Sequence, residues 1–519
     1  MLTLACALLL APGTNGSDWP QYRGPDTNSV VGAAKLPETW SASAGVAWKA
    51  KVASGWSQPI VIGGTVFVTE AAGGVERPIG MAAGIDDPST SKPGAVPDKE
   101  IEWRLVALDL ASGKERWSTT VRKGKPDQPI HRSNTWATET PVADAHGVYA
   151  YFGMPGTLAA YDHAGKSLWK VELGSHPIAN GFGTGSSPVI HEGKIYVQSF
   201  AEDAAFVVCL DTKSGKEVWR ETHEKPGTSW ASPLLWRSEK RTELVTSAQK
   251  LITGRDLATG KELWHIAGLE GPGMCSFAAD EERLYFGQRG PGSNPPLYAL
   301  AAGQSGDLSP AKGSRDAKGQ AWLATNGSPS MSSPVSAGGL VYVGMGDLLT
   351  CRDAATGEQL YEERVPDLLE LAASPIVIGD RLLLLGETGH ATWVPLGPEF
   401  EPVSAGQLDD LFWLSSILSG LPKAPAAPCG QDPANRASKE GKEAPGNAAV
   451  FDTPRPRCRD GPRGRAMRGD AWQVAQLLAR VWRGARARSF EDSGRFLSSR
   501  APNQPTQDGG EPPLPGGER

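Results

Sequence analysis

Two short patterns of apolar and polar residues alternate along most of this 519-residue chain. The first is a short apolar run, a turn of two to four residues rich in Gly or Asp, and a second run of β-branched and aromatic residues. This order is typical of a β-hairpin. Its clearest copies are SQPIVIGGTVFVTE (57–70), ETPVADAHGVYAYFG (139–153), SSPVIHEGKIYVQS (186–199), SSPVSAGGLVYVGMG (332–346) and ASPIVIGDRLLLLGE (373–387).

The second pattern has the form AxDxxTGKxxW and follows copies of the first along the chain. Its Gly suits a turn position with positive φ, so the apolar residues on either side are predicted to form another hairpin. One hairpin of each kind makes a unit of four strands. The clearest copies are ALDLASGKERW (107–117), AYDHAGKSLW (160–169), CLDTKSGKEVW (209–219), GRDLATGKELW (254–264) and CRDAATGEQLY (351–361).

The spacing of the first pattern predicts the fold. Four of the six gaps between successive copies are 41 to 47 residues long, and the two longer gaps hold Gly-rich insertions, 73–99 and 303–319, which we expect to be surface loops. A four-stranded repeat of about 45 residues indicates a β-propeller blade. We therefore predict an all-β protein: an eight-bladed type of β-propeller with seven complete blades and an incomplete eighth. The positions that mark the copies are Pro59, Pro141, Pro188, Pro233, Phe277, Pro334 and Pro375.

A large aromatic residue ends each copy of the second pattern. A sheet face that cannot bury itself must pack on its neighbour, so the same wedge between blades is expected all around the ring. The Asp and Lys of the pattern are interpreted as turn-forming and solvated residues. The predicted structural wedges are Trp117, Trp169, Trp219, Trp264 and Tyr361, with Trp48 and Trp322 in equivalent positions.

These repeats resemble those of the pyrroloquinoline-quinone-like (PQQ-like) β-propellers. That superfamily includes quinoprotein dehydrogenases and the outer-membrane assembly lipoprotein of the Bam complex. The stretch DWPQYRGPDTNSVV (18–31), followed by LPETW and VAWK, resembles exported PQQ-like repeat proteins of planctomycete-type bacteria. The resemblance covers about residues 18–413. It implies the propeller fold but not one activity, because one fold hosts many functions.

The N-terminus has an apolar run, 2–11, followed by small and turn-forming residues, which resembles a signal peptide. We expect residues 1–16 to be a signal peptide and the propeller, 17–418, to be periplasmic or extracytoplasmic. The run is shorter than the roughly 20 apolar residues of a membrane span, so no transmembrane span is predicted. The alternative is an apolar N-terminus on a cytoplasmic protein.

Both patterns stop after 408–418, which reads as the opening of an eighth blade. From Leu421 to the end there are 14 Arg and 13 Pro. Such a segment buries too little apolar surface to offset its ordering entropy, so residues 419–519 are predicted to be a disordered Arg/Pro-rich tail. Its origin is left open between a natural basic tail, a tail with an amphipathic helix at 470–488 that binds an anionic surface, and out-of-frame sequence after Trp413.

Candidate functional residues come from the loops before each copy of the first pattern, which should rim one end of the axial channel. Aromatic, amide and hydroxyl side chains there suit a ligand funnel. The eight His and six Cys form no metal-ligand or triad pattern, so no metal site and no catalytic residue are predicted, and Cys209, Cys275 and Cys351 are expected to be buried thiols. The predicted ligand-binding residues are Trp56, Arg132, Asn134, Trp136, Asn180, Thr184, Trp230 and Met331.

The resemblance implies that a quinoprotein dehydrogenase stacks its quinone between a Trp and a disulfide of two adjacent Cys, beside a carboxylate-bound Ca²⁺. This chain has no adjacent Cys. We therefore predict a non-catalytic exported scaffold of the cell envelope without a cofactor, which binds an envelope protein, a peptide or a glycan. The formal charge of −6 gives no reason to expect nucleic acid. The alternative is a PQQ-dependent quinoprotein oxidoreductase.

Overall fold

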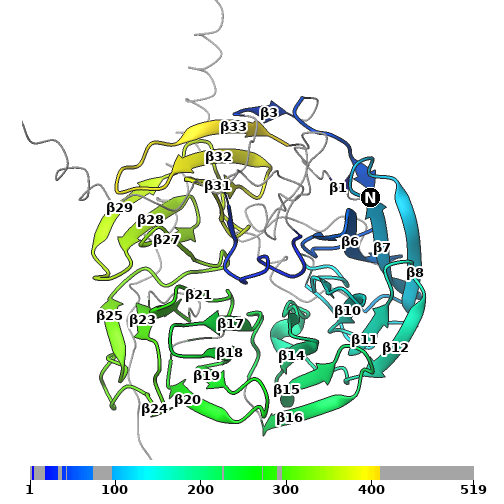
Figure 1. The fold of residues 1–519 in the computed structure, drawn as a ribbon, viewed down its shortest axis with the longest axis horizontal. Helices are drawn as coiled ribbons and strands as arrows, with labels where there is room; N and C mark the ends of the chain where they lie inside the picture. Colours follow the sequence, from blue (N-terminus) through cyan, green and yellow to red (C-terminus); the bar gives the residue numbers. More distant parts are fainter. Residues whose placement is uncertain are drawn as a thin grey trace, which may run out of the picture. The chain divides into compact units, whose positions relative to one another are not determined.

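The computed structural model describes residues 3–4, 18–32, 38–41, 44–73, 96–131, 133–224, 227–269, 271, 273–288 and 295–408, all within one compact unit, Met1–Gly430. Apart from one 3₁₀ turn, η1 (Ala179–Gly181), the described secondary structure is β-strand. The sheets of this unit follow one another in chain order around a ring (Figure 1). This confirms the all-β propeller. The expected eighth blade beyond Leu408 and the tail lie outside the described residues, so the blade count of eight stays a prediction.

Seven sheets of the described residues have four antiparallel strands in chain order, and we call them blades 1 to 7. Blade 1 consists of β5 (Ile60–Ile62), β6 (Thr65–Ala72), β7 (Ile101–Asp109) and β8 (Glu115–Gly124). Blade 2 consists of β9 (Val142–Ala143), β10 (Val148–Phe152), β11 (Thr157–Tyr161) and β12 (Ser167–Glu172). Blade 3 consists of β13 (Val189–His191), β14 (Lys194–Phe200), β15 (Ala204–Asp211) and β16 (Glu217–Glu224). Blade 4 consists of β17 (Leu234–Arg237), β18 (Thr242–Ala248), β19 (Leu251–Arg255) and β20 (Glu262–Ala267).

The remaining blades repeat this order. Blade 5 consists of β21 (Ala278–Ala279), β22 (Arg283–Phe286), β23 (Leu297–Ala301) and β25 (Gln320–Ala324). Blade 6 consists of β26 (Val335–Ala337), β27 (Leu340–Met345), β28 (Leu348–Asp353) and β29 (Gln359–Arg364). Blade 7 consists of β30 (Ile376–Ile378), β31 (Arg381–Leu385), β32 (His390–Pro395) and β33 (Val403–Gln407). The first pattern therefore supplies the two inner strands of a blade, and the second pattern the two outer ones.

The insertion at 303–319 is more than a surface loop. It contains β24 (Gly306–Asp307), which pairs in parallel with β20 and extends blade 4 by a fifth strand. Most of the insertion is exposed, as expected of a surface loop, but β24 was not predicted, because a two-residue strand has no hydrophobic pattern of its own. Residues 74–95 of the other insertion lie outside the described residues.

The wedge residues clamp each blade to the next. The indole N–H groups of Trp117, Trp169 and Trp219 donate to carbonyl oxygens in the second-pattern turn of the following blade, at 2.8–3.0 Å. Each indole also lies flat against the turn Gly: a Cβ on Gly215 would stand 2.6 Å from Cδ2 of Trp169. The repeated Gly is therefore required both by its positive φ and by the indole that covers it. Equivalent clamps join Trp48 to Leu110 and Trp322 to Ala354.

Two of the predicted wedges differ in detail. Trp264 is fully buried between blades 4 and 5, and its N–H donates to the Glu243 carboxylate at 3.1 Å instead of to a neighbouring turn. In blade 5 the insertion that carries β24 replaces the second-pattern turn to which the indoles of the other blades donate. Tyr361 packs on Phe400 of blade 7, with ring centroids 5.4 Å apart.

Gly215→Ala tests the clamp. A Cβ there must occupy the left-handed region (φ 66°) and collide with Trp169, so we expect the free energy of unfolding to fall by about 2–4 kcal/mol. The matched control is Gly338→Ala, where φ is 61° but no atom lies within 4 Å of the new Cβ, and only about 1 kcal/mol should be lost. Urea unfolding followed by tryptophan fluorescence measures both. Equal losses would show that the indole contact contributes nothing.

A ladder of hydroxyl groups links the inner ends of all seven blades. In blades 2 to 7 the Ser or Thr just before the Pro, or its equivalent, accepts the backbone N–H of the matching residue one blade earlier, at 2.9–3.0 Å. This explains why the first pattern begins with Ser-Pro. The ladder runs from the backbone N–H of Gln58 through Thr140, Ser187, Ser232, Ser276, Ser333 and Ser374.

Residues Asp18 to Val31, which we call the axial segment, cross the centre of the ring (Figure 1). Backbone hydrogen bonds join Trp19 to Val61 of blade 1 and Pro20 to Ala143 of blade 2. The Gln21 side chain accepts the N–H of Ile190 in blade 3 at 2.8 Å. Its later residues reach the other four blades. Asp26 forms an ion pair with Arg237 of blade 4, and Arg23 donates to the carbonyls of Phe277 and Pro334, at the starts of blades 5 and 6. Asn28 donates to the Ser336 carbonyl of blade 6, and β2 (Val30–Val31) pairs in parallel with β30 of blade 7.

The N-terminal residues also pack between blades 1 and 7. Trp19, Trp40 and Ala50 share one core cluster with Val61 of blade 1 and Trp393 of blade 7. β3 (Trp40–Ser41) pairs in parallel with β33, while β4 (Ala50–Lys51) pairs with β1 (Thr3–Leu4). Residues 46–49 form no strand, and the outer edge of blade 7 is covered by β3. No helix among the described residues is long and apolar enough to span a bilayer.

Candidate ligand-binding site

One residue from each blade faces the ring axis two positions before its ladder residue. Side chains two positions apart on an extended chain lie on the same side, so the ladder fixes the direction of these residues as well. All seven line a single cavity of about 250 Å³, which we call the axial cup. In chain order they are Trp56, Thr138, Gly185, Trp230, Met274, Met331 and Ala372.

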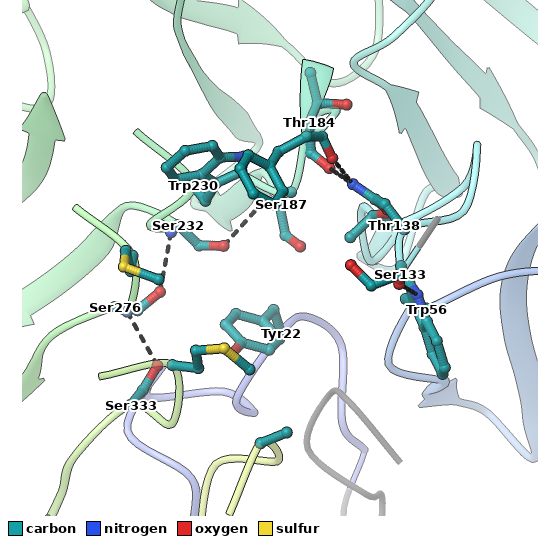
Figure 2. A pocket seen from close by; sticks show the side chains of 16 residues that line it. Tyr22, Trp56, Ser133, Thr138, Thr184, Ser187, Trp230, Ser232, Ser276 and Ser333 are labelled. Atoms are coloured by element: carbon teal, nitrogen blue, oxygen red, sulfur yellow. Dashed lines mark hydrogen bonds between the residues drawn. The ribbon is translucent and has the colours of Figure 1, made fainter. Parts of the chain in front are cut away.

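Tyr22 of the axial segment lines the same cavity, together with Ser133, Asn134, Phe182 and Thr184 from two loops (Figure 2). Four ladder residues complete the wall, Ser187, Ser232, Ser276 and Ser333. The described lining thus consists of aromatic, thioether, hydroxyl and amide side chains, with no charged side chain among them. Such a lining can orient a ligand by stacking and hydrogen bonding.

Hydrogen bonds hold the aromatic walls in place. The indole N–H of Trp56 donates to the Ser133 carbonyl at 2.9 Å, and that of Trp230 donates to the Gly183 carbonyl at 2.8 Å. Phe182 meets Trp230 edge to face, with ring centroids 6.0 Å apart. Because both indole N–H groups are engaged with backbone, these two side chains offer the cup only their ring surfaces.

Asn134 joins the two loops. Its side-chain amide donates to the carbonyls of Phe182 (2.5 Å) and Thr184 (3.4 Å), while its oxygen accepts from the Thr138 hydroxyl at 2.6 Å. Gly183 adopts a φ of 78°, and a Cβ there would approach the Asn134 amide nitrogen to 2.7 Å. Gly183 therefore allows the close packing of the two loops.

Five of the eight predicted rim residues line the cup: Trp56, Asn134, Thr184, Trp230 and Met331. Trp136 does not; it is 1% exposed and belongs to the core between blades 1 and 2. Asn180 lies in η1, and neither its side chain nor Arg132 is among the described parts of the chain. Whether the cup binds a ligand stays a prediction.

Sequence reasoning missed Tyr22, Phe182, Met274 and the ladder serines. The signal for Met274 was present, since it stands two residues before Ser276 as Met331 stands two before Ser333. Tyr22 had no such signal, because it comes from outside the repeats. Trp56 is also more deeply buried, at 6% exposure, than a rim position suggests.

Two ionisable groups lie directly behind the wall. Glu139 is 1% exposed and flanks Thr138. Burial raises the pKa of its carboxyl, and hydrogen bonds from Thr184 and the backbone offset part of this rise. His131 lies behind Ser133, with Nδ1 2.6 Å from the Ser133 hydroxyl. Neither group lines the cavity.

The described cysteines, Cys209, Cys275 and Cys351, are free and buried, as predicted. Burial raises the pKa of the Cys275 thiol to about 12 and those of the other two to about 11. All three are protonated at neutral pH and are poor nucleophiles.

Comparison with known proteins gives this geometry a context. Residues 155–292 match the PQQ_2 family, described as outer membrane protein assembly factor BamB. A polyvinylalcohol dehydrogenase from Pseudomonas sp. is 26% identical over 178 residues, which cover 26% of this chain. The match spans 27% of the length of that enzyme.

Among solved structures, BamB from Moraxella catarrhalis aligns with a TM-score of 0.43 and 16% identity, over 63% of this chain and 90% of BamB. A quinohemoprotein alcohol dehydrogenase from Pseudomonas putida HK5 aligns with a TM-score of 0.48 and 12% identity, over 77% of this chain and 73% of the enzyme. The ring of four-stranded sheets described above is a β-propeller, and its residues 155–292 are similar to the PQQ_2 family.

Proposed function

We propose that this protein is a non-catalytic binding and assembly scaffold of the cell envelope, which acts outside the cytoplasm and captures its ligand or partner in the axial cup. The observation that carries this proposal is the lining of the cup. Its described residues supply stacking surfaces and hydrogen-bonding groups, but no His, Asp, Glu, Lys or Cys that could transfer a proton or attack a substrate. The match to an assembly factor family supports the scaffold role.

The runner-up is a PQQ-dependent oxidoreductase, favoured by the partial likeness to polyvinylalcohol dehydrogenase. Trp56 and Trp230 offer ring surfaces on which a quinone could stack. The other requirements of the quinoprotein dehydrogenases do not fit the described residues. No carboxylate lines the cup to hold Ca²⁺, and the described cysteines are single and buried, so no vicinal disulfide can form from them.

Reconstitution separates the two functions. Purified protein incubated with PQQ and Ca²⁺ should show no oxidation of alcohols, polyvinyl alcohol or sugars with a dye acceptor, because nothing in the described lining positions the quinone and its metal. Quinone-dependent turnover would overturn the scaffold proposal.

The scaffold role has its own test in cross-linking from envelope extract. A partner should be captured by the wild-type protein and lost with Trp230→Ala, which removes a cup wall. Trp169→Ala, which changes a clamp on the outer strand of blade 2, is the matched control and should keep the partner. Equal capture by both variants would exclude the cup as the binding surface.

A further inference from the structure

The hydroxyl groups of four ladder residues accept a hydrogen bond from the described part of the protein but donate none to it. Ser187, Ser232, Ser276 and Ser333 each accept a backbone N–H on Oγ. A hydroxyl also carries one proton to donate, and within the described residues none of these four donates to a protein acceptor. All four line the cup, and the dashed bonds of Figure 2 show three links of their ladder along its wall. The cup therefore presents a row of uncommitted O–H donors.

A positive charge lies behind this row. Arg23 is 1% exposed, and its two terminal nitrogens donate to the carbonyls of Phe277 and Pro334, the residues that directly follow Ser276 and Ser333. Its Nε donates to the Ser29 hydroxyl at 3.0 Å. No carboxylate among the described residues forms an ion pair with it. Burial lowers its pKa, yet an arginine stays protonated at neutral pH, so its charge is compensated only by neutral acceptors.

Much of the remaining wall is apolar. Trp56, Phe182 and Trp230 present ring surfaces, and Met274 and Met331 present thioethers, which pack well against aromatic rings. The volume of about 250 Å³ lies at the small end for ligand pockets and suits one or two rings.

We propose that the axial cup binds a small aromatic carboxylate, with its ring between the aromatic and methionine walls and its carboxylate accepting from the ladder hydroxyls near Arg23. This inference rests on the proposed binding function and names its ligand class. A carboxylate is favoured over a neutral acceptor because hydrogen bonds to an ionised group are about twice as strong, and the buried guanidinium adds attraction in a medium of low polarity. An ammonium group would instead lie near the like charge of Arg23.

The test uses three probes of nearly equal shape: 2-naphthoate, 2-naphthamide and 2-naphthylmethylammonium. Isothermal titration of the full-length protein at pH 7.5 should give a dissociation constant for the naphthoate at least tenfold below that for the naphthamide, and no measurable binding of the ammonium. Equal or tighter binding of the amide or the ammonium overturns the inference while leaving a binding cup in place. Failure of all three to bind overturns it as well, whereas quinone turnover in the reconstitution assay would overturn the function itself.

Met331→Glu and Met331→Gln form a matched pair that tests whether the cup prefers a negatively charged ligand. Met331 lines the cup but belongs neither to the ladder nor to the axial segment, so circular dichroism should show that both variants keep the fold. Met331→Gln should retain the preference for naphthoate. Met331→Glu should weaken naphthoate at least tenfold and bring the ammonium into the measurable range. A preference that is the same in the two variants would show that the probes bind elsewhere.

Discussion

Replacing Arg23 by Ala is expected to lower the free energy of unfolding by about 3–5 kcal/mol, since the change leaves buried carbonyl acceptors without a donor. The side chain is 1% exposed and ties the axial segment to blades 5 and 6 at once, through Phe277 and Pro334. Its own backbone has a φ of 61°, in the left-handed region, so the segment holds a strained conformation that these contacts stabilise. Guanidinium chloride unfolding, followed by tryptophan fluorescence, measures the loss.

Arg237→Ala is the matched control for Arg23→Ala. Arg237 also joins the axial segment to a blade, through a 3.4 Å ion pair with Asp26, but Asp26 is exposed and Arg237 is only partly covered. Exposed pairs contribute about 0–1 kcal/mol. If the two substitutions cost the same, burial of the Arg23 guanidinium is not what secures the segment.

Trp264→Ala is expected to cost about 3–5 kcal/mol, the range for a fully buried aromatic residue replaced by Ala. Its indole is 0% exposed, lies in the core shared by blades 4 and 5, and donates to Glu243. The substitution opens a cavity and leaves a carboxylate oxygen of Glu243 without that donor, beside its remaining ion pair with Arg241 at 2.7 Å. Thermal or denaturant unfolding of the purified variant gives the value.

Trp169→Ala provides the comparison for Trp264→Ala. Trp169 stands at the same repeat position but is only half buried and donates to a turn carbonyl. About half the loss is expected, because roughly half as much apolar surface returns to water. A loss at Trp169 equal to that at Trp264 would mean that the clamps, and not burial, set the contribution of these residues.

The repeats made the propeller predictable. Each copy of the two patterns carries its own turn residues, strand alternation and wedge, so the local signals agree with the global fold in blade after blade. Positions such as Trp219 and Gly215 could be assigned because the same residues recur one period away. The cup residues Trp56, Trp230 and Met331 followed from their place before the inner strands.

The sequence could not reveal contacts made by residues that lie outside the repeats or that depend on how neighbouring repeats pack. The axial segment occurs once, and nothing in DWPQYRGPDTNSVV indicates that Arg23 bonds carbonyls 254 and 311 residues away. The hydroxyl ladder could not be predicted for another reason. A Ser before Pro is common in turns, and its hydrogen bond to the preceding blade can be recognised only once the packing of neighbouring blades is known. Trp136 was misplaced because an aromatic residue in a loop sequence gives no sign of whether it turns inward or toward the axis.

The axial segment also sets the order in which the ring can be completed during synthesis. Its residues leave the ribosome before those of every blade, yet its partners in blades 5, 6 and 7 emerge more than 250 residues later. At roughly 5–20 residues per second, the contacts of the segment with blades 1 and 2 can precede those with blades 5 to 7 by on the order of tens of seconds. Neighbouring blades can join as they appear, but the last of the central contacts, the pairing of β2 with β30, forms only after Val377 is available. The axial segment is therefore made before every blade but completes its docking only with the last described one, and a nascent chain halted before blade 7 would lack the pairing of β2 with β30.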